Sequence, residues 1–445
     1  MNNLEKSQLL RIFIARFLTR FGDQAWVFAV PLVIVGIYPH SLRPAAVYYL
    51  ARCIGETLFA SRVSEIIDTH SRKFVVKLGI GIQFFGSLIA IIIVYFMSKN
   101  AETSAFFSSA QSILLFSGLI ITGIMSSLGA ILTEISVGQD WLPEILSQGE
   151  LASANAMLKR LDLIAEVAAP FLAGLAFTFS AIPALAFGVI GIFNVLSFAL
   201  EFSFLNAVLQ SVGGRLNQKS AQPRISKKRG LIPLLKLNIS NIKELSNLES
   251  APMIFSMVLL HFSVLSPHGV LMTAFLKSAW NVSELNLSLF RGFGAIMGVV
   301  STLIFSKMVH KFGLFLTAQS GIYSQAIFLI LSLLSFYLFD TIGALWFLIC
   351  LVLSRIGLYL FSLSDKQYRQ LSIPPQHRGR LNGTAASLNS FVSILLYSAA
   401  SIFSDIQSFT YLCALSVGSV MFAVLVLSFF GGKVVTSSEI EVKSF

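Results

Sequence analysis

Long apolar stretches alternate with short polar ones along almost the whole chain. A helix needs about 20 residues to cross the hydrocarbon core of a membrane, and twelve stretches are long enough. We predict these spans at residues 8–36, 44–66, 74–97, 106–136, 150–178, 182–207, 251–276, 284–307, 313–338, 341–364, 379–403 and 408–431. The pattern therefore predicts an all-α membrane protein of about twelve transmembrane helices.

One long polar segment, 208–250, lies midway and divides the predicted helices into six and six. This is the layout of the major facilitator superfamily, whose two lobes are related by a parallel repeat. Span 3 contains Gly79-Ile80-Gly81-Ile82-Gln83, and span 9 contains the similar Gly321-Ile322-Tyr323-Ser324-Gln325. We expect an N-lobe at 1–207, a basic cytoplasmic linker at 208–250 and a C-lobe at 251–445.

The distribution of lysine and arginine predicts the orientation in the membrane. Loops on one side carry most of the basic residues, and the segment 208–250 alone carries Arg215, Lys219, Arg224, Lys227, Lys228, Arg229, Lys236 and Lys243. The loops on the other side carry only Arg43, Lys99 and Lys277. Because positive charge stays inside, both termini should be cytoplasmic, as an even number of spans requires.

Composition agrees with a lipid-facing fold. The mean hydropathy is +0.79, 55% of the 445 residues are hydrophobic and only 12% are charged. The net charge of +11 does not indicate nucleic-acid binding, because the basic residues lie between apolar spans. Cys53, Cys350 and Cys413 are too far apart for a CxxC zinc site or a disulfide framework. The first span is too charged for a cleavable signal.

Ionisable residues inside the spans are the candidate functional groups, since each costs about 2.5–3.5 kcal/mol at mid-membrane on insertion scales. Asp23 lies in the middle of span 1, next to Gly22. An intrahelical pair with Arg20 is one interpretation. A cation ligand in a central cavity is the other, and we favour it because Gly22 allows close approach.

Span 6 carries Asn194, Ser197 and Glu201 at spacings that place them on one helix face, beside Phe198. A polar seam between helices would explain them, but the carboxylate favours a cation path. Gln83 lies at a similar depth in span 3. Together with Asp23, these oxygen donors suit a hard cation such as Ca²⁺.

Span 7 contains His261 and His268, with Pro267 and Gly269 nearby. Proline and glycine predict a helix broken near Pro267, the kind of element that forms transporter sites. The two histidines are seven residues apart and would share a face if the helix continued through the break. Imidazole suits Fe²⁺, Co²⁺, Ni²⁺ and Zn²⁺, so either histidine is a candidate ligand, His261 first. Arg291, in span 8, and Arg355, in span 10, are expected to pair with carboxylates or carbonyls.

The loop between spans 2 and 3 carries Asp68 and, four residues later, Arg72. This pattern resembles the cytoplasmic gate motif of the major facilitator superfamily. The alternative is a solvated loop with flanking charges.

Several motifs in order along the chain resemble the ferroportin family of iron exporters. They are Gly22-Asp23-Gln24-Ala25-Trp26-Val27-Phe28-Ala29-Val30, Gln139-Asp140-Trp141, Asn155-Ala156-Met157-Leu158-Lys159-Arg160-Leu161-Asp162, Arg355-Ile356-Gly357-Leu358 and Arg378-Gly379-Arg380-Leu381-Asn382-Gly383. The resemblance implies Fe²⁺ export by a major-facilitator fold, with proton exchange in some members.

The resemblance also implies roles for individual residues. The family's N-lobe metal position matches Asp23, and its activating calcium site matches Asp23, Gln83, Asn194 and Glu201. Its cytoplasmic gate matches Asp68, Arg72, Asp140, Asn155, Lys159, Arg160 and Asp162. Three family ligands are absent, because Val27, Gly269 and Leu396 stand where the family has histidine, cysteine and histidine. His261 or His268 would then replace the C-lobe ligands.

We therefore predict a transporter, not an enzyme, that exports a divalent transition metal by alternating access, with Fe²⁺ as the first candidate and Co²⁺, Mn²⁺, Ni²⁺ and Zn²⁺ as further ones. Asp23, Asn194, Ser197, His261 and His268 are the candidate metal ligands. The expected partners are the metal ion, protons and lipid, with Ca²⁺ as a modulator, no further cofactor, no nucleic acid and a monomeric state. The Asp68/Arg72 and Asp140/Arg160 groups are expected to bridge the cytoplasmic helices of the lobe in the outward-facing state. The alternative is an exporter of organic cations or drugs; no HExxH or GxSxG motif supports an enzyme.

Overall fold

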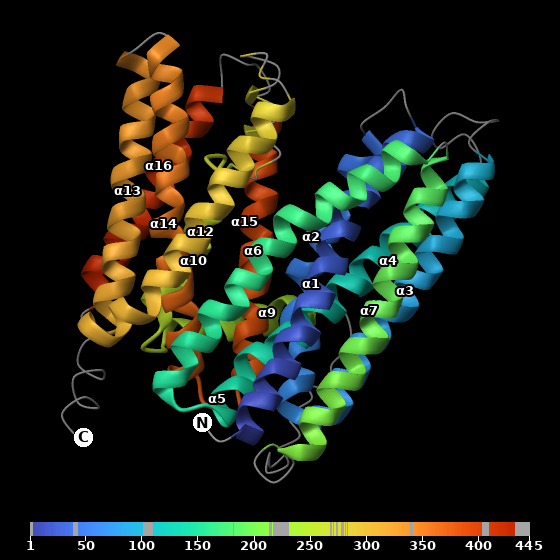
Figure 1. The fold of residues 1–445 in the computed structure, drawn as a ribbon, viewed down its shortest axis with the longest axis horizontal. Coiled ribbons are helices and arrows are strands. Elements are labelled where there is room, and N and C mark those ends of the chain that lie inside the picture. Colours follow the sequence, from blue (N-terminus) through green and yellow to red (C-terminus); the bar gives the residue numbers. More distant parts are fainter. Residues whose placement is uncertain are drawn as a thin grey trace. The chain divides into compact units, whose positions relative to one another are not determined.

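The computed structural model describes residues 3–38, 43–100, 110–180, 182–212, 216, 231–267, 269, 271–272, 275–276, 280, 282, 284–338, 341–402 and 409–431. These residues form helices and connections, and no strand occurs among them (Figure 1). The helices of the first half are α1 Asn3–Ile37, α2 Arg43–Thr69, α3 Arg72–Asn100, α4 Ala110–Ile135, the π-helical η2 Ser136–Trp141, α5 Leu142–Ile145, α6 Gln148–Phe179 and α7 Pro183–Ser211. Those that follow are α9 Leu231–Ser246, α10 Ala251–Leu260, α12 Glu284–Phe312, α13 Leu314–Leu338, α14 Thr341–Ser372, α15 Arg378–Ile402 and α16 Phe409–Phe430.

Nine helices in the described part of the chain are long and apolar enough to cross a membrane. Two more, α2 and α15, have 27 and 25 residues but are more polar than those nine. The helix α10 is apolar but has only 10 residues. The prediction of an all-α membrane protein is confirmed.

The chain forms two compact units. Unit 1 consists of Met1–Ile145, Ile164–Ile239 and Pro375–Ser387, and unit 2 of Leu146–Leu163, Ser240–Pro374 and Leu388–Phe445. Within unit 1, α1 packs along α7, α3 packs against both α4 and α7, and α2 packs against α4 (Figure 1). Within unit 2, α14 packs against α12 and α13, and α16 packs against α10 and α13. Unit 1 includes the first residues of α15, and unit 2 includes the first residues of α6.

The predicted linker 208–250 contains the helix α9, which the sequence analysis did not anticipate. Its apolar residues recur at helical spacing between polar ones, as in Leu231, Leu235 and Ile239, which explains why a segment judged polar overall is helical. The Asn238 Nδ2 atom lies 3.2 Å from the Leu58 carbonyl oxygen of α2. The first part of this helix, up to Ile239, belongs to unit 1 and contacts α2 there.

Glycines bring α3 and α4 into close contact. A Cβ atom at Gly79 would lie 2.6 Å from Thr133 Oγ1, and one at Gly129 would lie 2.8 Å from the Gly79 carbonyl oxygen. In unit 2, α13 and α14 meet in the same way, since a Cβ atom at Gly321 would lie 2.9 Å from the Gly357 carbonyl oxygen. The similar segments Gly79–Gln83 and Gly321–Gln325 thus form equivalent helix contacts in their two units, because small residues let helix backbones approach closely.

Gly357→Ala is expected to destabilise the protein by about 1–3 kcal/mol, the usual cost of overpacking. Its Cβ atom would lie 2.4 Å from the Gly321 carbonyl oxygen and 2.6 Å from the Gln325 backbone nitrogen, and backbone atoms cannot move aside. Gly292→Ala, in α12 of the same unit, has no atom within 4 Å of the new Cβ and is the matched control. Thermal unfolding in detergent should show a lower midpoint for the first variant and an unchanged or higher one for the second.

The break in span 7 occurs six residues earlier than predicted. The helix α10 ends at Leu260, whereas the sequence suggested a break at Pro267. Proline clashes with the carbonyl four residues before it, here that of Ser263, so the chain leaves the helix before the proline is reached. The predicted break is present, so His261 and His268 do not lie on one continuous helix, and His268 lies outside the described residues.

Other helices of unit 2 bind the unwound segment. The Val264 backbone nitrogen donates to Ser416 Oγ at 3.0 Å, and Arg355 Nη2 donates to the Leu265 carbonyl oxygen at 2.8 Å. Non-helical backbone is tolerated at membrane depth only when such partners satisfy its polar groups. The expectation that Arg355 pairs with a carbonyl is confirmed.

Candidate functional site

The candidate site in unit 1 lies where Gly22 of α1 meets Asn194 of α7. A Cβ atom on Gly22 would lie 2.3 Å from Asn194 Oδ1, so only glycine leaves room for this amide. Asn194 is 1% exposed, and its Oδ1 atom has no hydrogen-bond partner. An amide oxygen is thus held, without a donor, beside the backbone that carries Asp23.

Asp23 is partly exposed on α1 and lies among several charges. Arg20, Arg16, Glu134 and Arg52 all act electrostatically on its carboxylate. Arg20 Nη1 lies 3.7 Å from Glu134 Oε2 of α4, so this guanidinium pairs with another helix rather than solely serving Asp23.

Glu201 is fully buried on α7, one side of which also carries Asn194 and Ser197. Neither of its carboxylate oxygens has a hydrogen-bond partner. The Thr19 hydroxyl faces this carboxylate, but it donates to the Ala15 carbonyl of its own helix at 3.1 Å. Burying an ionised carboxylate without partners costs several kcal/mol or more, and a bound cation would remove that cost.

Gln83 of α3 is also fully buried. Its Nε2 atom donates to the Gly79 carbonyl oxygen and to Thr133 Oγ1, both at 3.3 Å, while its Oε1 atom has no partner. A Cβ atom on Gly191 of α7 would lie 2.5 Å from Ile91 of α3, so these two helices also pack closely. Counting eight residues along each antiparallel helix from that contact places Gln83 between Asn194 and Glu201 in depth.

Buried polar atoms in proteins nearly always have partners, yet unit 1 holds several oxygens that lack them. Ser197 is an exception, because its hydroxyl donates to the Phe193 carbonyl at 2.9 Å. Asp23, Gln83, Asn194 and Glu201 supply two carboxylates and two amide oxygens, a donor set that fits Ca²⁺ or another hard divalent cation. The fit rests on the oxygens of Gln83, Asn194 and Glu201 that have no donor.

In unit 2, His261 directly follows α10. Its Nδ1 atom lies 2.8 Å from the Met257 carbonyl oxygen. A carbonyl can only accept, so Nδ1 carries a proton and the neutral ring presents its lone pair at Nε2, the usual arrangement for a metal-binding histidine. Asp365 of α14 acts electrostatically on this ring. No group of three or more histidine, cysteine, aspartate and glutamate side chains forms a metal cluster within the residues that the structure describes.

The predicted gate residues of unit 1 make strong contacts. Asp68, at the end of α2, accepts hydrogen bonds from the backbone nitrogens of Gly379 and Arg380, both at 2.8 Å. These are orphan donors at the first turn of α15, where a carboxylate is favoured. A Cβ atom on Gly383, one turn later, would lie 2.5 Å from Ser64 of α2. The start of α15 is thus bound tightly to α2.

Arg72 binds Asp140 through two hydrogen bonds, from Nε to Oδ2 at 2.7 Å and from Nη2 to Oδ1 at 3.1 Å. Its Nη1 atom donates to the Leu216 carbonyl at 2.6 Å. Asp140 is fully buried within the π-helical segment η2, a type of bulge that often marks functional sites. Arg378 of α15 adds an ion pair to Glu144 at 2.7 Å.

The other predicted gate residues lie in unit 2. Asn155 and Gln370 exchange reciprocal amide hydrogen bonds of 2.6 and 3.1 Å. Arg160 Nε donates to Thr302 Oγ1 at 2.9 Å, and Lys159 Nζ lies 4.8 Å from the centre of the Tyr359 ring. Arg72 takes Asp140 as its partner, so these two predicted gate residues join α3 to η2. Asp162 is partly exposed.

Sequence reasoning missed several partners. Glu144, Gln370 and Thr302 were not predicted, because they lie 142 to 234 residues from the side chains that they bind. Arg16 was not predicted as a site residue, although its spacing from Asp23 places both on one face of α1. That spacing was the available signal.

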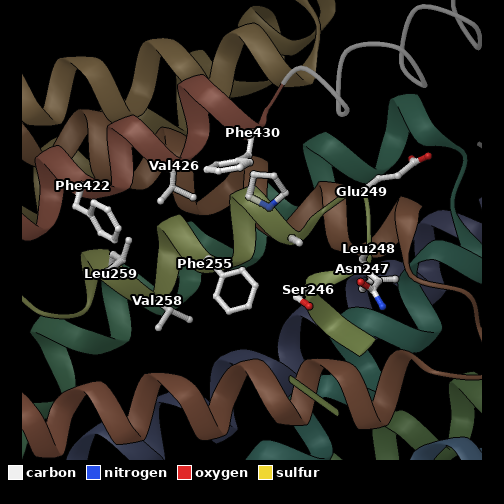
Figure 2. Close-up of a pocket in the computed structure, with 12 residues that line it drawn as sticks. Ser246, Asn247, Leu248, Glu249, Phe255, Val258, Leu259, Phe422, Val426 and Phe430 are labelled. Carbon is white, nitrogen blue, oxygen red and sulfur yellow. The ribbon is translucent and has the colours of Figure 1, made fainter. Parts of the chain in front are cut away.

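Unit 2 also has a pocket of about 560 Å³ that is lined by residues of α10, α16 and the segment 246–249. Its chemistry differs from that of the candidate metal ligands. Phe255, Phe422 and Phe430 line it, with Glu249 at its polar end (Figure 2). Its lining is mostly aromatic and aliphatic, which does not suit a metal ion. The candidate ligands therefore do not belong to this pocket.

Comparison with known proteins gives a consistent result. The family model for Ferroportin1 (FPN1) matches residues 6–420. The chain is 35% identical over 429 residues to "Ferreportin" of Bdellovibrio bacteriovorus, covering 94% of each chain. It is similar to the crystal structure of a bacterial homologue of iron transporter ferroportin in an outward-facing state with soaked iron, with a TM-score of 0.84, 34% identity and coverage of 95% of this chain and 98% of the other. The human organic anion transporter MFSD10 matches with a TM-score of 0.65 at 11% identity, which shows the fold alone.

The fold and these matches define a multi-pass membrane protein of the major-facilitator type. The chain belongs to the ferroportin family.

Proposed function

We propose that this protein exports a divalent transition metal, Fe²⁺ first, across a bacterial inner membrane by alternating access, with both termini in the cytoplasm. The observation that carries the proposal is the set of buried oxygens without donors on α3 and α7, beside Asp23 of α1. The matched relatives support it, since one of them is a homologue of an iron transporter crystallised with soaked iron.

The candidate ligands have different proposed roles. Asp23 supplies a carboxylate that solvent can reach, so it is suited to meet an incoming ion, and Asn194 adds an amide oxygen fixed against Gly22. Gln83 and Glu201 would complete a calcium site with these two, and Ca²⁺ there would hold α1, α3 and α7 together. His261, with Nδ1 bound to Met257, would offer Nε2 to a transition metal in unit 2.

Export of a divalent cation against an inside-negative potential costs about 4.6 kcal/mol per 100 mV for two charges. Inward proton movement would offset this cost. Metal ligands must lose protons to bind, so Asp23, Glu201 and His261 are the groups proposed to exchange protons for metal.

The gate contacts fit the closed state of the cytoplasmic side. Asp68 bound to the first turn of α15, and Asn155 bound to Gln370, join segments that lie hundreds of residues apart. We propose that these hydrogen bonds form when the cytoplasmic side closes and break when metal enters from it. Neutral amide pairs and N-terminal caps suit this role, because each is worth only about 0.5–2 kcal/mol.

Glu201→Gln is expected to weaken Ca²⁺ binding at least about tenfold, since it removes one of the charges that a calcium site requires. Calorimetry on the purified protein with Ca²⁺, Mg²⁺ and Co²⁺ measures the effect. Glu249→Gln, on the exposed surface of unit 2, is the matched control and should bind as wild type does. Equal Ca²⁺ affinity in Glu201→Gln and wild type would remove Glu201 from the site.

An exporter of organic cations is the second candidate, because the apolar pocket of unit 2 has space for such a molecule. Flux into or out of liposomes separates the two. Competition by Co²⁺ and none by a quaternary ammonium ion supports metal export, and the reverse result supports the alternative.

A further inference from the structure

The packing of α1 on α7 fixes which residues face Glu201. Successive spans alternate in direction, so the first and sixth run antiparallel. Gly22 of α1 meets Asn194 of α7. Glu201 lies seven residues further along α7, about 10 Å away at 1.5 Å per residue. The same step along α1, toward its N-terminus, arrives at residues 15 and 16.

Arg16 is therefore level with Glu201. It is 8% exposed, and it lies seven residues before Asp23, on the same face of α1. Its charge acts on both the Asp23 and the Glu201 carboxylates. The other group of α1 that faces Glu201 is the Thr19 hydroxyl, which is already bonded to Ala15.

The Arg16 guanidinium does not pair directly with either carboxylate. Within the described residues, no ion pair or hydrogen bond joins its guanidinium to Asp23 or Glu201, and both Glu201 oxygens lack a donor. A buried carboxylate next to an arginine that does not bind it is unusual, since such groups normally pair directly. The arrangement leaves space beside the oxygens and a positive charge close by.

We infer that Arg16 is a fixed counter-charge of the N-lobe cation site. When the site is empty, its positive charge partly replaces the charge of the missing cation. When the site is filled, the same charge repels the bound cation. This inference rests on the proposed function, because it assigns a regulating residue to the same site. Arg16 acts through the carboxylates and is a positioning residue, not a ligand, since a guanidinium has no lone pair to offer a metal.

Two consequences follow from one charge. In the empty site, Arg16 lowers the cost of holding Asp23 and Glu201 ionised together. In the filled site, it repels the cation and so limits affinity, which favours release. This lower affinity favours export, because a site that binds the metal ion too tightly cannot release it.

The test uses the full-length protein in detergent and in liposomes. Arg16→Gln removes the charge and keeps much of the length, and Arg16→Lys keeps the charge. Arg11→Gln is the matched control, since it removes the same charge from the same helix but does not act on either carboxylate. Calorimetry with Co²⁺ and with Ca²⁺ should give an affinity about tenfold tighter for Arg16→Gln than for wild type, and an unchanged affinity for Arg11→Gln.

Two further readouts separate this role from a structural one. In liposomes, Arg16→Gln should lower both the KM and the maximal rate of Co²⁺ flux, while Arg16→Lys stays near wild type. In thermal unfolding, Arg16→Gln should melt below wild type in EDTA and gain more from added Ca²⁺. A variant that only disturbs packing would bind more weakly instead of more tightly.

The outcomes distinguish the two claims. If wild type binds Co²⁺ or Ca²⁺ and Arg16→Gln binds with equal or lower affinity, the counter-charge is overturned and the metal site stands. If neither wild type nor the variant binds either ion, the proposed function and the inference both fail.

Discussion

Replacing Asp23 with alanine should reduce Co²⁺ or Fe²⁺ transport in liposomes to the level of liposomes without protein. Asp23 is the candidate carboxylate in unit 1 that solvent reaches, whereas Glu201 is fully buried. Without it, an entering divalent cation meets Asn194 and the positive charges of Arg16 and Arg20. The attraction between two opposite unit charges about 4 Å apart is about 4 kcal/mol at an effective dielectric constant of 20. Losing that much binding energy lowers the affinity by roughly three orders of magnitude.

Asp23→Asn tests whether charge or shape matters. The amide keeps the size of the carboxylate and one oxygen, so a purely structural residue would tolerate it. We expect transport to be lost in Asp23→Asn as well, and to be retained in Glu249→Ala, which removes an exposed carboxylate from unit 2. Undiminished flux in Asp23→Ala would exclude this residue from the transport mechanism.

Replacing Arg72 with methionine should destabilise the protein by about 3–5 kcal/mol, the usual cost of leaving one partner of a buried ion pair uncompensated. The side chains of Arg72 and Asp140 are 5% and 0% exposed, and the pair is bidentate. The variant also loses the hydrogen bond to the Leu216 carbonyl. Thermal or chemical unfolding in detergent measures the loss.

A double variant and an exposed pair provide the controls. Arg72→Met combined with Asp140→Leu should recover much of the lost stability, because no buried charge is left alone. Arg62→Ala breaks the more exposed Arg62–Glu65 pair, whose arginine is 27% exposed, and should cost at most about 1 kcal/mol. If Arg72→Met proves no more harmful than Arg62→Ala, the pair has no structural role.

These predictions differ in what they test. The Asp23 variants address the cation site on α1, and the Arg72 variants address the contact of α3 with η2 and Leu216 at the proposed gate. A protein can fail one test and pass the other, because no described contact links Asp23 to Asp140 within unit 1.

The sequence by itself determined the membrane fold and the candidate ligands. Helix spans follow from local apolar length, and the common face of Asn194, Ser197 and Glu201 follows from helical period, so both can be predicted without tertiary contacts. Gly22 next to Asp23 likewise indicated a close approach, which Asn194 makes. These properties depend on residues within a few turns of one another.

The tertiary structure alone decided which partners these residues take. Asp140 binds Arg72, 68 residues away, a pairing that the sequence did not specify. Beyond Leu260, Ser416 and Arg355, far along the chain, accept and donate the hydrogen bonds that the unwound backbone requires. Whether Arg16 lies at the same depth as Glu201 depends on the register of α1 against α7. Periodicity places a side chain on a face, but only the packing of that face against another helix selects the group opposite.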